Sequence, residues 1–155
     1  MFRIVVSVVL SAFASYAADP LVGVWEMNPT KSSFHGKPAP SFRETITQAS
    51  DGLRIRREMV NAAGKALDRT YSYIFDGKSH LAEFEVDANH SHHTIRCERK
   101  APGQIERVTD HDHGKATSLN RHTLSPDGKT LTLVRSGSDD GNGKPYRDTL
   151  VLERR

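Results

Sequence analysis

The chain has 155 residues, 36% of them hydrophobic and 26% charged, with a net charge of +3. A length of this order suits one folded domain with a substantial core. Acidic residues are interspersed among the basic ones, as in Arg54-Ile55-Arg56-Arg57-Glu58, which argues against a nucleic-acid-binding surface. The single cysteine, Cys97, excludes an intrachain disulfide framework.

Residues 1–17 have the three parts of a secretory signal peptide. Arg3 precedes an apolar run from Ile4 to Phe13, and Ser15-Tyr16-Ala17 supplies small residues for cleavage. The apolar run is too short to cross a bilayer as a helix, and a buried N-terminal helix is the alternative interpretation. We therefore expect a signal peptide at 1–17, a single domain at 18–155, no membrane span, and a periplasmic or secreted location.

After the signal peptide, short segments that alternate apolar and polar residues are separated by turn residues, and no long segment has helical periodicity. The turns contain glycine, as in Ser50-Asp51-Gly52 and Asp76-Gly77-Lys78, so consecutive strands should be antiparallel neighbours. We expect an all-β, up-and-down antiparallel barrel of about 8–10 strands. Three prolines between residues 29 and 41 argue against a helical lid. The predicted strands lie near 21–27, 42–49, 53–60, 67–75, 80–86, 93–100, 104–110, 115–124, 129–136 and 146–154.

The first predicted strand contains Gly23 and Trp25, the only tryptophan of the chain. Both residues point to the same face, and the glycine removes a side chain next to the large ring. Trp25 can therefore close one end of a small barrel.

Alternation along the other strands predicts which side chains face the lumen. Arg57 shares a face with Ile55, and Glu44 shares a face with Ile46. Charged groups inside a barrel must be paired or hydrated, which indicates a partly wet lumen. The alternative is a register shifted by one residue, with these charges in solvent. The candidate ligand-binding residues of the lumen are Tyr71, Tyr73, Phe75, Arg57, Leu131 and Leu133.

The lone thiol of Cys97 shares a strand face with Ile95. This position predicts a buried cysteine in the core. The alternative is an exposed thiol that forms an intermolecular disulfide or ligates a metal.

The Gly23-x-Trp25 opening resembles that of the calycins, the superfamily of lipocalins and fatty-acid-binding proteins. In those proteins a late arginine or lysine packs over the tryptophan. The resemblance implies this structural role for Arg154, with Arg147 and Arg135 as weaker matches.

The chain also resembles small exported bacterial proteins with a lipocalin-like barrel and no assigned activity. The similarity lies in Trp25…Asn28…Lys31-Ser32…Phe34 and in the ending from Leu124 to Thr132, followed by Gly137 and Gly143-Lys144-Pro145.

Three features depart from the superfamily. The proline-rich 29–41 segment replaces the helix–turn–helix lid of fatty-acid-binding proteins, and no C-terminal helix like that of lipocalins follows the last strand. The Arg-x-Tyr pair that holds a carboxylate in the final strand of fatty-acid-binding proteins has its spacing here in Arg69-Thr70-Tyr71, in an early strand. Carboxylate recognition is therefore not carried over.

Four histidines, His92, His93, His111 and His113, flank a predicted hairpin around Ala101-Pro102-Gly103. Strand pairing would bring His92 or His93 opposite His111 or His113, within reach of one shared metal. Imidazole and nearby carboxylates suit Zn²⁺ or Cu²⁺. The alternatives are a rim of solvated histidines and a rim that loosens when the histidines become charged below about pH 6.5.

No nucleophile elbow, P-loop or dinucleotide fingerprint is present, so we expect a binding protein and not an enzyme. The leading hypothesis is a monomeric exported carrier of a small hydrophobic or amphipathic ligand. This hypothesis assigns the protein no cofactor. The alternatives are a divalent-metal-binding protein and a ligand-free interaction or structural module.

Overall fold

The computed structural model describes residues 18–61, 63–81, 93–111, 114–140 and 142–155. All described regular structure is β-sheet, which confirms the predicted all-β class. The ten strands are β1 (Gly23–Met27), β2 (Ser41–Ala49), β3 (Gly52–Val60), β4 (Ala66–Ile74), β5 (Ser79–Leu81), β6 (Thr94–Ala101), β7 (Gln104–His111), β8 (Ala116–Leu124), β9 (Thr130–Gly137) and β10 (Tyr146–Arg154).

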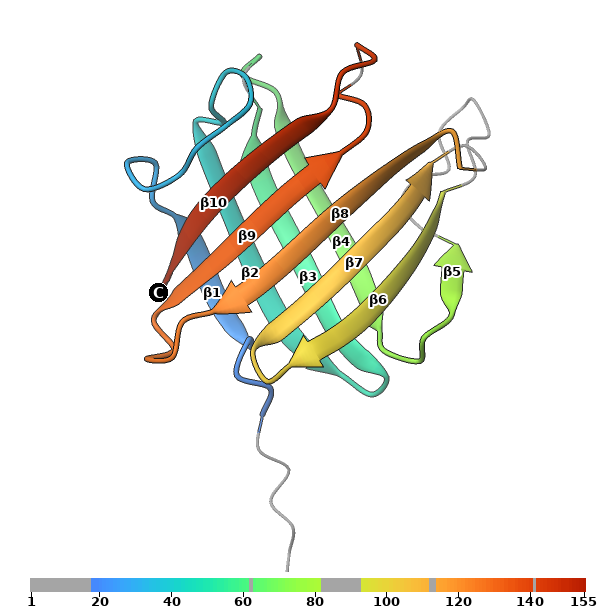
Figure 1. Ribbon diagram of the computed structural model, residues 1–155. Coiled ribbons are helices and arrows are strands. Elements are labelled where there is room, and N and C mark those ends of the chain that lie inside the picture. The colour runs from blue at the N-terminus through green and yellow to red at the C-terminus, as the bar shows by residue number, and fades with distance from the viewer. Residues whose placement is uncertain (1–17, 62, 82–92, 112–113, 141) are drawn as a thin grey trace, which may run out of the picture.

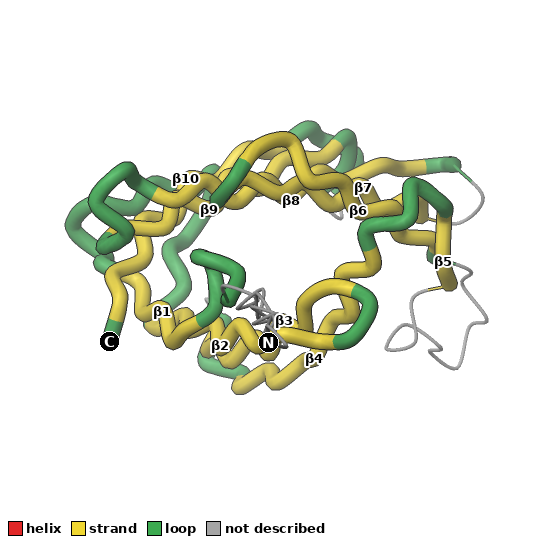
Figure 2. Tube along the Cα trace, turned by 90° about the horizontal axis from the view of Figure 1, so that it is seen from below, coloured by secondary structure: helices red, strands yellow, loops and turns green. Residues whose placement is uncertain are grey.

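The strands form one antiparallel sheet in the order β4-β3-β2-β1-β10-β9-β8-β7-β6-β5. Figure 1 shows the sheet curling so that β1 to β4 face β6 to β10, and Figure 2 shows the same ring from its end. The first and last strands pair, with Trp25 opposite Arg154. The edges of the sheet are the consecutive strands β4 and β5, so the ladder is interrupted there and not between the chain's first and last strands.

The predicted strands match the observed ones closely, except that the strand predicted at 80–86 is described only in part. Residues 79–81 form β5, whereas 82–86 of the predicted strand lie outside the described residues. Within the described part of the chain, no helix is long and apolar enough to cross a membrane.

Segment 28–40 crosses one end of the barrel without forming a helix. Ser33 forms a bridge with Thr149, and the Ser32 hydroxyl accepts a hydrogen bond from the Val151 amide at 3.0 Å. These contacts hold the segment beside β10, so the proline-rich sequence acts as a strap at the barrel mouth, the end that it crosses.

The opposite end of the barrel is closed by Trp25, which is completely buried. Its indole Nε1 donates a hydrogen bond to the Leu21 carbonyl at 2.9 Å. The Arg154 guanidinium lies 4.2 Å from the ring centroid and donates to the Val22 and Pro20 carbonyls at 2.9 and 2.8 Å. Gly23 has φ +152°, a backbone conformation that favours glycine, and a Cβ there would lie 2.7 Å from Arg154 Nη1 and displace the guanidinium.

Cys97 is buried in the core. Burial raises the pKa of its thiol to about 11, so the group stays protonated at neutral pH. This environment is that of an inert core cysteine.

Candidate functional site

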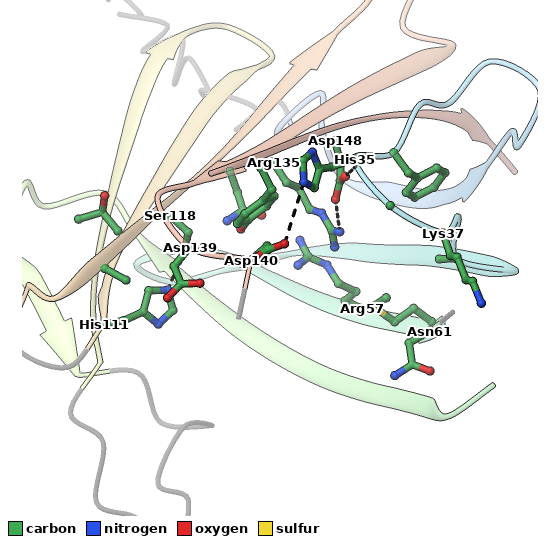
Figure 3. Close-up of a pocket in the computed structure, with 18 of the residues that line it drawn as sticks. His35, Lys37, Arg57, Asn61, His111, Ser118, Arg135, Asp139, Asp140 and Asp148 are labelled. Carbon is green, nitrogen blue, oxygen red and sulfur yellow. Dashed lines mark hydrogen bonds and ion pairs between the residues drawn. The ribbon is translucent and has the colours of Figure 1, made fainter. Parts of the chain in front are cut away.

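A cavity of about 570 Å³ opens at the barrel mouth, beneath the 28–40 strap (Figure 3). Its outer wall is mixed: the strap contributes Phe34, His35 and Lys37, and the β9–β10 loop contributes Asp139 and Asp140. Its inner floor is strongly polar and contains the side chains of Arg57, Arg107, Asn120, Arg135 and Asp148.

Alternation places these floor residues inside. On β3 the buried side chains are Leu53, Ile55 and Arg57, and on β7 they are Ile105, Arg107 and Thr109. Each strand therefore carries apolar residues toward the Trp25 end and polar residues toward the mouth. The inward register of Arg57 and Glu44 excludes the shifted-register alternative.

Arg57 is held by Glu44, which lies directly opposite it in the β2–β3 hairpin. Arg57 Nε and Nη2 both donate to Glu44 Oε1, at 2.9 and 2.7 Å. The guanidinium also lies between two rings, 5.2 Å from the centroid of Phe42 and 5.0 Å from that of Tyr71. These contacts compensate the buried charge and fix its direction.

Glu44 is completely buried and has a second partner, His122, on the opposite side of the barrel. His122 Nε2 donates to Glu44 Oε2 at 3.0 Å. Burial raises the pKa of Glu44, but attraction to His122 and Arg57 and their hydrogen bonds outweigh burial and lower the pKa to about 2. Glu44 is therefore a carboxylate at neutral pH, and Nε2 of His122 must carry the proton.

The other ring nitrogen of His122, Nδ1, is buried without a hydrogen-bond partner. Tyr73 packs edge-on against this ring, with centroids 5.9 Å apart. The Tyr73 hydroxyl is also buried without a partner, and burial raises its pKa. Buried polar atoms in folded proteins are nearly always hydrogen-bonded. His122 Nδ1 and the Tyr73 hydroxyl can therefore each take a further hydrogen bond, for example from a buried water.

Arg107 has no carboxylate partner among the described residues. It is 5% exposed, and its Nε and Nη1 are buried without acceptors. Its guanidinium stacks on Tyr71, 4.4 Å from the centroid, and lies 5.8 Å from that of Tyr73. A buried cation that packs against aromatic rings and has no carboxylate beside it is incompletely compensated.

The third guanidinium of the floor, that of Arg135, is paired with Asp148. Arg135 Nη2 donates to Asp148 Oδ2 at 2.6 Å, and the His35 backbone amide donates to Asp148 Oδ1 at 2.9 Å. Asp148 thus links the floor to the strap. Figure 3 shows His35 between this pair and Asp140, whose Oδ2 lies 4.0 Å from His35 Nε2.

Of the six predicted lumen residues, Arg57 is the one that lines the cavity. Tyr71, Tyr73, Leu131 and Leu133 are buried in the core around and below the floor, and Phe75 is half-buried under Arg99. The cavity therefore occupies the polar half of the barrel and not the apolar half that the sequence emphasised.

Sequence reasoning missed Arg107 and Asn120 as lumen residues and considered Arg135 only as a partner for Trp25. Alternation with Ile105 marks Arg107 as inward-facing, by the same signal that identified Arg57. Arg147 and Arg135 do not contact the indole, which Arg154 covers.

The predicted approach of histidines across the hairpin is confirmed for His93 and His111, whereas metal binding stays a prediction. The ring nitrogens His93 Nδ1 and His111 Nδ1 lie 2.7 Å apart, and His111 Nε2 lies 3.1 Å from the Ser118 hydroxyl. His111 also lines the cavity. His92 and His113 lie outside the described residues. Within the described ranges, no group of three or more His, Cys, Asp or Glu side chains is arranged to hold a metal ion.

Comparison with solved structures identifies the fold. The chain is similar to a Schistosoma mansoni fatty acid binding protein in complex with arachidonic acid, over 89% of this chain and 98% of that one, with a TM-score of 0.57 and 14% identity. It is similar to As-p18, an extracellular fatty acid binding protein, over 89% and 98%, with a TM-score of 0.53 and 12% identity. A variant of the fluorescent protein UnaG matches over 88% and 96%, with a TM-score of 0.54 and 10% identity.

The sequence matches no protein-family model and no curated protein. At identities this low the structural similarities establish architecture alone. This chain has the calycin-like fold of the fatty-acid-binding proteins, built without a helical lid in its described residues.

Proposed function

We propose that this protein binds a small amphipathic molecule in the cavity at the mouth of its barrel. The observation that carries the proposal is the 570 Å³ cavity, whose floor holds buried polar groups without partners. Its volume lies within the range of small-molecule sites, and such sites combine apolar walls with a few convergent polar groups.

The wall and the floor offer different chemistry to such a ligand. Phe34, Ala39 and Met59 provide apolar surface at the mouth, whereas Arg57 and Arg107 provide guanidinium groups below. A molecule with an apolar part and a polar end matches this arrangement. The fold neighbours support the proposal, because one was solved with arachidonic acid and another is named as an extracellular fatty acid binding protein.

We propose binding and not catalysis, because the fold neighbours are named for binding. The cavity wall does contain a serine–histidine contact, with His111 Nε2 3.1 Å from the Ser118 hydroxyl. We further propose that residues 1–17 direct export and that the monomeric mature protein acts in the periplasm or outside the cell. N-terminal sequencing of the mature protein from its host tests this: cleavage after Ala17 is expected, and an intact Met1 in the folded protein contradicts it.

Cavity filling tests the proposed function. Ala116 lines the cavity, so Ala116→Trp should block it. Ala101 is exposed at the end of β6, at the opposite end of the barrel, so Ala101→Trp is the matched control. Titration with anilinonaphthalene sulfonate, whose fluorescence rises in apolar sites, should show saturable binding to the wild type and the control and at least about tenfold weaker binding to the filled variant. Equal binding by all three proteins, or none by any, contradicts the proposal.

Metal binding at the rim is a second candidate, favoured by the 2.7 Å approach of His93 and His111. Two imidazoles on one side of a cavity mouth can ligate Zn²⁺ or Cu²⁺ if a third ligand joins them. Isothermal titration of each metal into the wild type and into a His93→Ala, His111→Ala double variant tests it. Absence of micromolar binding, or binding undiminished in the double variant, contradicts this candidate.

A further inference from the structure

A serine and two histidines form a hydrogen-bonded chain at the barrel mouth, where β6 begins, β7 ends and β8 begins. His111 Nε2 lies 3.1 Å from the Ser118 hydroxyl, and His111 Nδ1 lies 2.7 Å from His93 Nδ1. His111 and Ser118 both line the cavity. The middle imidazole therefore uses its two ring nitrogens for different partners, which is the order of a nucleophile, a base and an orienting group.

The proton positions in this chain decide whether the serine is activated. A neutral imidazole carries one proton, so His111 donates through only one of its nitrogens. When His111 Nδ1 donates to His93, His111 Nε2 keeps its lone pair and accepts the Ser118 hydroxyl proton. In Figure 3 the Asp139 carboxylate points toward the His111 ring, so a negative charge faces the imidazole as it takes up this proton.

The wall around Ser118 also offers donors to the oxygen of a reacting carbonyl group. Thr109 lies opposite Ser118 in the β7–β8 ladder, and Arg107 lies opposite Asn120, the next residue on the inner face of β8. Arg107 and Asn120 line the same cavity as Ser118. Their side-chain N–H groups can stabilise the negative oxygen that forms when a nucleophile attacks a carbonyl carbon.

From this geometry we infer that Ser118 is an activated nucleophile, which accepts an acyl group from a small ester bound in the cavity. The Ser118 oxygen bonds to the carbonyl carbon and the ester C–O bond breaks. The leaving alcohol takes the proton that passed from Ser118 to His111. The product is an ester of Ser118, so the step captures a bound ligand covalently and goes beyond the proposed function, which needs no covalent bond. The apolar surface of Phe34, Ala39 and Met59 in the same cavity favours esters of small aliphatic acids.

4-Nitrophenyl butyrate tests this inference, because acyl transfer releases coloured nitrophenolate and leaves a butyryl group on the protein. The wild-type protein is assayed with a chelator present, so that no metal occupies the histidines. Absorbance follows the release, intact mass counts the butyryl groups, and peptide mapping locates them. We expect a burst of one equivalent of nitrophenolate and one butyryl group on Ser118.

Variants assign the role of each side chain. Ser118→Ala should abolish the burst, whereas Ser72→Ala, which removes a hydroxyl from the outer face of β4, is the matched control and should leave it unchanged. His111→Gln should slow the burst by at least about a hundredfold, because it removes the general base.

His93 is a positioning residue, because it acts on Ser118 through His111. His93→Phe removes the acceptor of the His111 Nδ1 proton and should slow the burst. His93→Asn supplies a side-chain oxygen that accepts this proton, so it should restore most of the rate. A merely structural role for His93 would not produce this rescue.

Binding of anilinonaphthalene sulfonate shows which variants keep the cavity and separates the two proposals. If the wild type binds this dye without a burst, or if Ser118→Ala binds it and keeps the burst, the inference is wrong while the binding function stands. A butyryl group on Lys37, the competing nucleophile that lines the cavity, also contradicts the inference. Release that continues beyond one equivalent and requires Ser118 supports the nucleophile and contradicts the assignment of binding without catalysis.

Discussion

The two ends of the barrel bury very different side chains. Around Trp25, the interior is made of fully buried aliphatic residues such as Leu131, Leu133 and Leu152. Toward the mouth, β3 and β7 bury the charged groups of Arg57 and Arg107, and the partner of Arg57 is Glu44, which lies opposite Trp25 in the β1–β2 ladder. One half has a conventional apolar core, and the other half has ion pairs and unpartnered polar atoms.

This difference indicates where stability and function reside. Apolar packing contributes to folding wherever it occurs, whereas a buried polar atom without a partner lowers the free energy of unfolding. A barrel selected only for stability would carry aliphatic residues in the half near the mouth as well. Local violations of folding rules are expected at functional sites, so the charged half is the one that we assign to binding.

The largest effect should come from Trp25→Ala at the closed end. The substitution removes a fully buried ring and leaves a cavity, and it also removes the surface under Arg154. We expect the free energy of unfolding to fall by about 4–5 kcal/mol. Urea unfolding followed by circular dichroism measures it, and a loss below about 1 kcal/mol would show that the ring does not hold this end together.

Glu44→Gln should have the next largest effect, in the charged half. It removes the charge that compensates the buried Arg57, and breaking such a pair costs about 3 kcal/mol or more. Combining it with Arg57→Met should recover much of the loss, because no unpaired guanidinium remains. A double-mutant cycle by urea unfolding gives the coupling, and additive losses would contradict a buried pair.

The same residue makes a pH prediction. The pKa of Glu44 is about 2 in the folded protein, below its ordinary value of 4.5. Its contribution is therefore complete above about pH 4.5 and is lost as the pH falls toward 2, by roughly 3 kcal/mol in all. Urea unfolding as a function of pH should show this loss in the wild type and a flatter profile in Glu44→Gln. Parallel profiles would mean that other carboxylates govern acid unfolding.

Much of this arrangement could be predicted from the sequence. The turn at Ser50-Asp51 defines a hairpin in which Glu44 lies opposite Arg57, and alternation places them on the face of Ile46 and Ile55. Which face points inward is decided by the structure. Ladder register also follows from the other short turns. Local pattern therefore accounts for the fold class and for charges inside the barrel.

The rest depends on contacts across the barrel, which local pattern does not encode. His122 reaches Glu44 from β8, 78 residues away in the chain. The lack of an acid for Arg107 becomes visible only when every strand is in place. The size of the cavity, and its position above the aromatic layer of Tyr71 and Tyr73, depend on how the sheet curls.

Arg154→Ala should have an intermediate effect at the closed end. The guanidinium stacks on Trp25 and donates to three backbone carbonyls, including that of Gly128 at 3.0 Å. These contacts lie at the surface, so we expect a loss of about 1–2 kcal/mol, well below that of Trp25→Ala. Urea unfolding tests the order of the two variants, and Arg147→Ala, which alters an exposed arginine on the same strand, should stay within about 0.5 kcal/mol of the wild type.

Tyr73→Phe should have the smallest effect, with the opposite sign. The ring stays in the core, while the buried hydroxyl, which has no partner, is removed. We expect the ligand-free protein to become more stable by up to about 1 kcal/mol, because a desolvated polar atom disappears without loss of a hydrogen bond. Thermal unfolding of the ligand-free protein measures the change. A loss of more than about 1 kcal/mol would show that the hydroxyl is bonded to water in the folded protein and is not an unsatisfied buried group.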